Sequence, residues 1–328
     1  MHGAGILAYY VSWEEKERMQ AILSTHLNVP STSPLRRSTR TATFKEDCSK
    51  IECFLRDILH VDTEKGYVRT EPSVDMGYMT RTLVPLGVQL AIQVEMEALT
   101  IGGLCMGLGM ETNSHRFGLL QETVLAFEIV TSQGELLRVT RENNPELFYA
   151  LPWSHGTLGF LVAVELKIIP IKPYVHVRYL PCHTQAELCE QMKELSEAED
   201  PPEFLEATVY SKEKSVIQIG EFAEVDTPEK RRKVNGVNHF WKPWYYLHVK
   251  QALTSKGGFD EYIPVRHYHH RFTRSIFWEL RDLIPFGNHP LYRYLLGWLG
   301  APKVSFIKLT MTPQIRREVV YKHVVQDM

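Results

Sequence analysis

A glycine-rich run constrains this chain more than any other feature. Residues 99–115 contain four glycines within eight positions, interleaved with apolar side chains and followed at once by Thr, Asn, Ser and His. Glycine has no Cβ, so it lets backbone N–H groups approach a bulky ligand closely and it readily adopts positive φ. Such N–H groups, with nearby hydroxyls, suit an anion such as a pyrophosphate. Taken alone, the run could equally be a tight turn between two buried elements.

Two well-known phosphate-binding motifs are excluded. Gly102 and Gly107 have the spacing of a Walker A loop, but Leu108 and Gly109 stand where Lys and Ser or Thr are required. A Rossmann fingerprint needs G-x-G-x-x-G directly after a strand, and that pattern is absent.

A second block follows downstream. Residues 144–150 read NPELFYA, and residues 151–160 carry Gly156 and Gly159 just before an apolar stretch. That stretch alternates, with Phe160, Val162, Val164, Leu166 and Ile168 on one side and Glu165 and Lys167 on the other. The alternation predicts a strand with one face buried.

Local patterns predict further elements. Residues 124–130 and 135–139 flank Ser-Gln-Gly and predict a hairpin between the two blocks. Elsewhere the sequence predicts a strand pair within 58–71, a helix over 76–84 ended by Pro-Leu-Gly, a helix over 185–198 and a hairpin over 207–220.

Both blocks together resemble the FAD-binding domain of the vanillyl-alcohol-oxidase (PCMH-type) flavoproteins. In that family a Gly-rich segment and a later segment wrap the diphosphate and the flavin. Within the family the resemblance is to the delta-24 sterol reductases, and it extends from about residue 57 to the last residue. It is carried by residues 99–115, 151–160, 261–264, 266–271, 273–279, 284–288, 294–299 and 323–328. The resemblance implies an α+β fold, with a PCMH-type FAD-binding domain followed by a partial α+β substrate domain.

The resemblance also implies non-covalent FAD held by the two blocks. The residues expected to bind it are Thr100, Ile101, Gly102, Gly103, Leu104, Cys105, Met106, Gly107, Leu108, Gly109, Met110, Glu111, Thr112, Ser114, His115, Ser154, Gly156 and Gly159.

The implied reaction is reduction of an isolated side-chain double bond of a sterol such as desmosterol. Reduced flavin gives hydride to one carbon, a protein group supplies a proton to the other, and NADPH restores the flavin. The candidate proton donors are Tyr268, His269, His270 and Glu279, although each residue taken singly is more often structural.

Three domains are expected. Residues 1–43 are expected to hold an N-terminal helix over 13–27 and a linker over 25–43. Residues 44–171 are expected to form the FAD-binding domain, and residues 172–328 the substrate domain.

Two features of the family are not found in this sequence. Before residue 55 the Arg-Pro-Trp loop of the first flavin-binding subdomain is not visible, and family members continue beyond residue 328. The alternative function is therefore a weakly active or inactive paralogue or fragment that binds a sterol or a partner. An oxidase of small alcohols is disfavoured because the later runs match the sterol reductases.

The composition of the chain does not indicate binding of nucleic acid or metal ions. Lys and Arg number 37 against 39 Asp and Glu, so no basic excess indicates nucleic acid binding. The five cysteines show no CxxC or zinc spacing, and no metal site is expected.

No run approaches the roughly 18–20 apolar residues that span a bilayer. The resemblance implies the endoplasmic reticulum membrane, and the chain as given would be cytosolic or peripheral. Aromatic and basic residues within 239–303 could make a sterol pocket and a peripheral membrane contact, or could simply pack in a core. The oligomeric state is left open.

Overall fold

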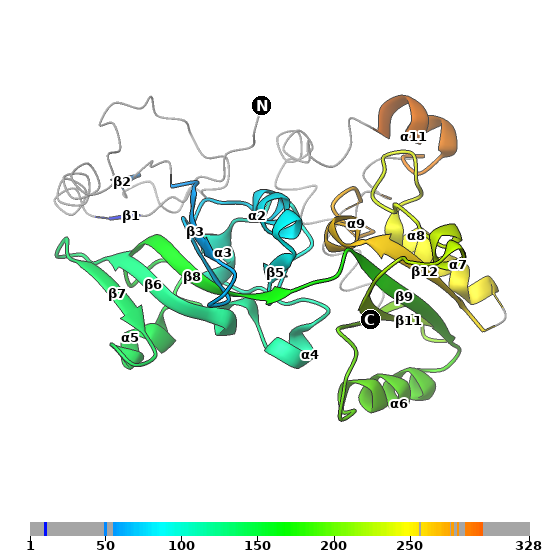
Figure 1. Cartoon of the computed structure of the whole chain (residues 1–328), viewed down its shortest axis with the longest axis horizontal. Helices are drawn as coiled ribbons and strands as arrows, with labels where there is room; N and C mark the ends of the chain where they lie inside the picture. The colour runs from blue at the N-terminus through cyan, green and yellow to red at the C-terminus, as the bar shows by residue number, and fades with distance from the viewer. Residues whose placement is uncertain are drawn as a thin grey trace. The chain divides into compact units, whose positions relative to one another are not determined.

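The computed structural model describes Tyr10–Val11, Ser49–Lys50 and residues 55–297 except positions 256, 276, 279–280 and 282–285. It divides into two compact units, Met1–Ile171 and Lys172–Met328, each described by itself below (Figure 1). The helix expected over 13–27 and the linker over 25–43 lie outside the described residues. Tyr10–Val11 (β1) and Ser49–Lys50 (β2) pair as antiparallel strands.

The first unit is built on an antiparallel sheet in the order β3-β4-β8-β6-β7, with β5 also paired to β8. The strands are β3 (Ile58–Asp62), β4 (Tyr67–Thr70), β5 (Val88–Leu90), β6 (Val124–Val130), β7 (Leu136–Thr140) and β8 (Phe160–Pro170). The predicted strand pair and hairpin are therefore confirmed, because turn residues separate their alternating strands.

Short helices connect these strands. They are α2 (Met76–Leu83), α3 (Ile101–Cys105), α4 (Ser114–Phe117) and α5 (Pro145–Ala150), with 3-10 turns η2 (Val84–Leu86) and η3 (Leu120–Thr123). Helix α2 begins where the Asp75 side chain accepts from the Tyr78 N–H at 2.6 Å. It ends as predicted, at the 3-10 turn that contains Pro85 and at Gly87, whose φ is 73°.

The long strand β8 corrects one expectation. Leu161 and Ala163 are as buried as Phe160 and Val162, so the first half of the strand has no exposed face. β8 lies inside the sheet, and a continuous apolar run is typical of a strand covered on both faces. The predicted alternation holds only from Glu165 onward.

The second unit has its own antiparallel sheet, in the order β10-β11-β9-β12. Its strands are β9 (Tyr174–Cys182), β10 (Phe204–Ser211), β11 (Lys214–Ala223) and β12 (Phe259–Pro264). Helix α6 (Gln185–Ser196) packs Leu188, Met192 and Leu195 on a cluster that includes Cys182 and Ile217. The predicted helix and hairpin of this unit are thus observed.

Five short helical segments complete the described part of the second unit. They are α7 (Pro228–Arg232), α8 (Tyr245–Val249), η4 (Lys250–Thr254), α9 (Val265–His269) and α11 (Pro290–Leu296). Both units combine helices with antiparallel sheet, which confirms the expected α+β class. Among the described residues, none of the helices has the length and apolarity needed to span a bilayer.

Candidate functional site

The first half of the glycine-rich block is helix α3, and it is built into the core. Ile101, Leu104, Cys105 and Met106 are buried, and burial raises the pKa of the Cys105 thiol. The N–H groups of Ile101 and Gly102 donate to the carbonyl oxygens of Val74 and Pro72 at 2.9 and 2.8 Å. These two donors are engaged by the protein itself. Thr100 precedes the helix without a side-chain cap bond, and Gly103 is exposed.

The second half of the block is a partly exposed loop. Leu108 and Met110 are 47% and 67% exposed, far more than apolar residues that belong to a core. No hydrogen bond among the described residues uses the N–H of Gly107, Leu108 or Met110. Successive backbone N–H groups without protein acceptors can bind an anion. The loop thus fits the diphosphate of a dinucleotide better than the helix start does.

Gly107 and Gly109 of this block allow close approach of the backbone, but the positive φ expected of such glycines is not observed. None of the four is among the residues with positive φ. A Cβ at Gly107 would lie 2.7 Å from the Gly103 carbonyl oxygen, and a Cβ at Gly109 would lie 2.7 Å from the Leu120 Cβ. Both distances are too short for any side chain, so the loop can take this path only with glycine.

Polar residues after the loop mostly hold the loop itself. The Glu111 carboxylate accepts the N–H groups of Glu95 and Thr112 at 3.0 and 3.2 Å. Ser114 Oγ accepts the Glu111 N–H at 2.9 Å. His115 lies in α4 and is half-buried. Glu111 and Ser114 therefore fix the end of the loop.

The second block meets the first at one backbone contact. The His155 N–H donates to the Met106 carbonyl oxygen at 3.0 Å, and Ser154 Oγ lies 3.7 Å from Met106 Sδ. Trp153, His155 and Gly156 have φ of 67°, 51° and 80°, so the chain turns sharply here. Positive φ in two non-glycine residues stores strain, which is common where backbone geometry serves a ligand.

Gly159, one of the residues expected to bind the cofactor, lies directly before β8. A Cβ there would lie 3.1 Å from Ile129 Cδ1 and 3.3 Å from the Val130 carbonyl oxygen. The residue therefore packs against β6 at the start of β8. Its absence of a side chain serves the sheet.

Gln121 is a polar residue of this region that the sequence reasoning missed. Its Oε1 accepts the Gly109 N–H at 3.3 Å, and its Nε2 is buried without a partner among the described residues. A buried amide that leaves a donor unused is costly unless a water or ligand accepts it. No local sequence pattern marked it, because its role depends on packing against Gly109.

Three candidate proton donors lie at the end of α9, all buried in the second unit. Tyr268, His269 and His270 are each at most 2% exposed. Burial, together with His270 and Arg271, holds the pKa of His269 well below its usual 6.5. His269 is therefore neutral at neutral pH and is not a cationic acid. Glu279 lies outside the described residues.

A buried carboxylate in the same unit was also missed. Glu261 accepts from Tyr179 Oη at 2.7 Å and Asn235 Nδ2 at 2.6 Å, and its Oε1 lies 2.7 Å from His248 Nε2. Tyr179 Oη is also 3.0 Å from Tyr245 Oη. Since Tyr179 has one proton and gives it to Glu261, Tyr245 donates to Tyr179. Burial holds the pKa of both phenols well above 10, so both keep their protons.

Comparison with known proteins identifies the first unit. Residues 38–140 match the family model of a FAD binding domain. The chain is 44% identical to the Delta(24)-sterol reductase of Homo sapiens over 291 residues, which cover 89% of this chain and 56% of the relative.

Relatives from two other species have similar identity and coverage. Identity is 42% to the Caenorhabditis elegans Delta(24)-sterol reductase homolog dhcr-24, over 90% of this chain and 58% of the relative. It is 42% to the Arabidopsis thaliana Delta(24)-sterol reductase, over 83% of this chain and 50% of the relative. The chain thus spans about half the length of the curated relatives it matches. On these matches the chain belongs to the PCMH-type FAD-binding flavoproteins and is related, within that family, to the Delta(24)-sterol reductases.

Proposed function

We propose that this protein is a FAD-dependent oxidoreductase that reduces the side-chain double bond of a sterol such as desmosterol, with NADPH as the reductant. One observation carries the proposal. The His155–Met106 bond joins the two blocks beside the N–H groups of Gly107, Leu108 and Met110, which have no acceptor among the described residues. The similarity to proteins named Delta(24)-sterol reductase supports the choice of substrate.

The loop residues would hold FAD without a covalent bond. The N–H groups of Gly107, Leu108 and Met110 would donate to the diphosphate, because an anion there would supply acceptors that the described part of the protein does not. Exposed apolar side chains of both blocks, including Trp153 and Leu158, would pack against the cofactor and exclude water. When bound and reduced, FAD supplies the hydride.

The proton must come from a protein group because an isolated alkene has no carbonyl to polarise. Tyr268, His270 and Glu279 remain the proposed donors, since His269 is held neutral by its surroundings. The phenol of Tyr268 carries one O–H donor, which suits a general acid. The sterol itself requires an apolar, aromatic cavity with one or two polar groups.

We further propose that the protein works at the endoplasmic reticulum membrane, where a sterol substrate would dissolve. The measurement that tests the reaction uses the full chain with FAD, NADPH and desmosterol. Absorbance in the flavin bands reports cofactor binding, anaerobic bleaching by NADPH reports flavin reduction, and chromatography reports cholesterol. Bound flavin that NADPH bleaches, without cholesterol, would reject the sterol reaction alone. Purified protein without flavin would reject the enzyme and favour a sterol-binding or partner-binding protein.

A further inference from the structure

We propose that a rigid aromatic surface on the second unit docks onto lipid bilayers that carry anionic headgroups. The surface, called here the aromatic plate, consists of Phe240, Trp241, Leu291, Tyr294 and Leu295. This inference deepens the proposed membrane location and rests on it. It does not rest on the flavin chemistry.

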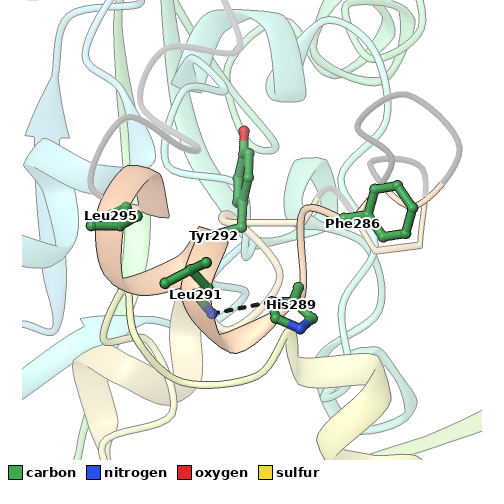
Figure 2. Close-up of a pocket in the computed structure, with 5 residues that line it drawn as sticks. All are labelled: Phe286, His289, Leu291, Tyr292 and Leu295. Atoms are coloured by element: carbon green, nitrogen blue, oxygen red, sulfur yellow. Dashed lines mark hydrogen bonds between the residues drawn. The ribbon is translucent and has the colours of Figure 1, made fainter.

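Helix α11 contributes an exposed apolar stripe. Leu291, Tyr294 and Leu295 stand at i, i+3 and i+4, so they share one face of the helix. They are 63%, 64% and 61% exposed, which is unlike the buried stripe of a helix packed on a core. Figure 2 shows Leu291 and Leu295 on α11 lining one pocket with Phe286, His289 and Tyr292.

A neighbouring loop contributes the aromatic half of the plate, and Arg274 holds this loop in place. The guanidinium group of Arg274 is largely buried and donates to five acceptors of the loop. They are the carbonyl oxygens of Val237 (2.9 Å), Phe240 (3.3 Å), Lys242 (3.0 Å) and Pro243 (2.9 Å) and Oδ1 of Asn238 (3.3 Å).

Contacts of Arg293 and Gly297 join the helix to the loop. Arg293 of α11 donates to the Trp241 carbonyl oxygen at 2.8 Å, and the His239 ring stacks on Trp241 with centroids 4.4 Å apart. At the end of α11, a Cβ at Gly297 would lie 2.8 Å from the Phe240 carbonyl oxygen. Phe240 and Trp241 are therefore presented in a fixed geometry, which lowers the entropy lost on binding.

The charge of the two segments that carry the plate selects the partner. The described residues of 235–255 and 286–297, which include the loop and α11, contain no Asp or Glu. Lys242 of the loop and Arg293 of α11 are half-buried cations that donate to Asn235 Oδ1 and to the Trp241 carbonyl oxygen, each at 2.8 Å. Aromatic and aliphatic groups flanked by Lys and Arg suit a bilayer interface with anionic lipids.

Vesicle flotation with the full FAD-loaded chain tests this proposal. The probes are vesicles of phosphatidylcholine alone and vesicles with phosphatidylserine added, each at low and high salt. We expect binding to the anionic vesicles that weakens with salt. The double variant L291S/L295S should lower the partition coefficient on the order of tenfold, because two leucines no longer enter the interface. The matched control L59S/L86S removes two exposed leucines from the first unit and should bind as the parent does.

Each other outcome rejects the inference in a distinguishable way. Equal flotation of parent, variant and control would reject the aromatic plate and leave the membrane location standing. No flotation of the parent on either vesicle would reject both, without touching the flavin chemistry. If sedimentation velocity showed that L291S/L295S converts a dimer to a monomer and the parent ignored vesicles, the plate would be an interface between copies. Far-UV circular dichroism and flavin content show that the variants are folded.

Discussion

The His155 N–H donates to the Met106 carbonyl oxygen at 3.0 Å, and this bond joins two glycine-containing segments that are far apart in the sequence. Around this bond the backbone turns sharply, with positive φ at Trp153 (67°), His155 (51°) and Gly156 (80°). The loop that follows Met106 is thereby held beside the second segment, so a change in either segment should affect the cofactor.

Replacing Gly107 by Val should abolish flavin retention. The new Cβ would lie 2.7 Å from the Gly103 carbonyl oxygen, and that oxygen is backbone, so the loop itself must move. Movement would displace the N–H groups of Leu108 and Met110 from the proposed diphosphate site. The ratio of flavin to protein absorbance after purification measures the effect.

Gly103→Ala is the matched control for that change. Its Cβ would meet only the Thr100 Oγ1, at 3.1 Å, and alanine favours the helix in which it stands. The control should keep its flavin. If Gly107→Val kept as much flavin as the parent, with an unchanged circular dichroism spectrum, the assignment of this loop would be wrong.

Substitutions at His155 should change stability in opposite directions. A non-glycine residue in the left-handed region costs about 1–2 kcal/mol, so His155→Gly should raise or leave unchanged the free energy of unfolding. His155→Val should lower it by more than about 1 kcal/mol, because β-branched side chains fit positive φ worst. Urea unfolding of the two variants measures the difference. Equal stability of the Gly and Val variants would show that the strain at this position is not real.

The sequence predicted those parts of the fold that depend on neighbouring residues. The hairpin around Gly134 and the end of α2 at Gly87 follow from turn residues beside alternating or periodic patterns. The meeting of His155 with Met106 could not be predicted, because histidine does not favour the φ it adopts there. The partners of Arg274 were equally hidden, since five acceptors from one distant loop leave no local pattern. No sequence pattern marks Glu261 as buried, and only packing shows that it is.

Arg274→Lys should destabilise the second unit by about 2–4 kcal/mol, since hydrogen bonds to a charged donor are worth about 1.5–3 kcal/mol each and are not additive. A lysine ammonium has three donors and cannot reach five acceptors arranged around a planar group. Arg266→Lys, at an exposed position of α9, is the control and should change stability by less than about 0.5 kcal/mol. Chemical unfolding followed by tryptophan fluorescence compares them. Similar midpoints for the two variants would contradict the anchoring role of Arg274.

Acid should destabilise the second unit through His267. Burial first, and then His239, Arg266 and Arg274, lower the pKa of His267 from 6.5 to about 4 in the folded protein. Between these two values the unfolded chain binds more protons than the folded chain, so the free energy of unfolding falls as the pH falls. Above about pH 6.5 both states hold a neutral ring, and this group contributes no pH dependence.

The variant His267→Gln isolates that contribution. Glutamine does not titrate, and its side-chain oxygen can accept the Asn238 N–H that now reaches His267 Nδ1 at 3.2 Å. Urea midpoints of parent and variant, measured from pH 7.5 downward, should run parallel above about pH 6.5 and diverge below it. The parent should lose stability faster between about pH 6.5 and 4, because only the parent carries an imidazole that its folded state keeps neutral. Carboxylates titrate equally in both proteins and cancel in the difference. Curves that stay parallel down to pH 4 would mean that His267 takes up its proton in the folded protein as readily as in the unfolded chain.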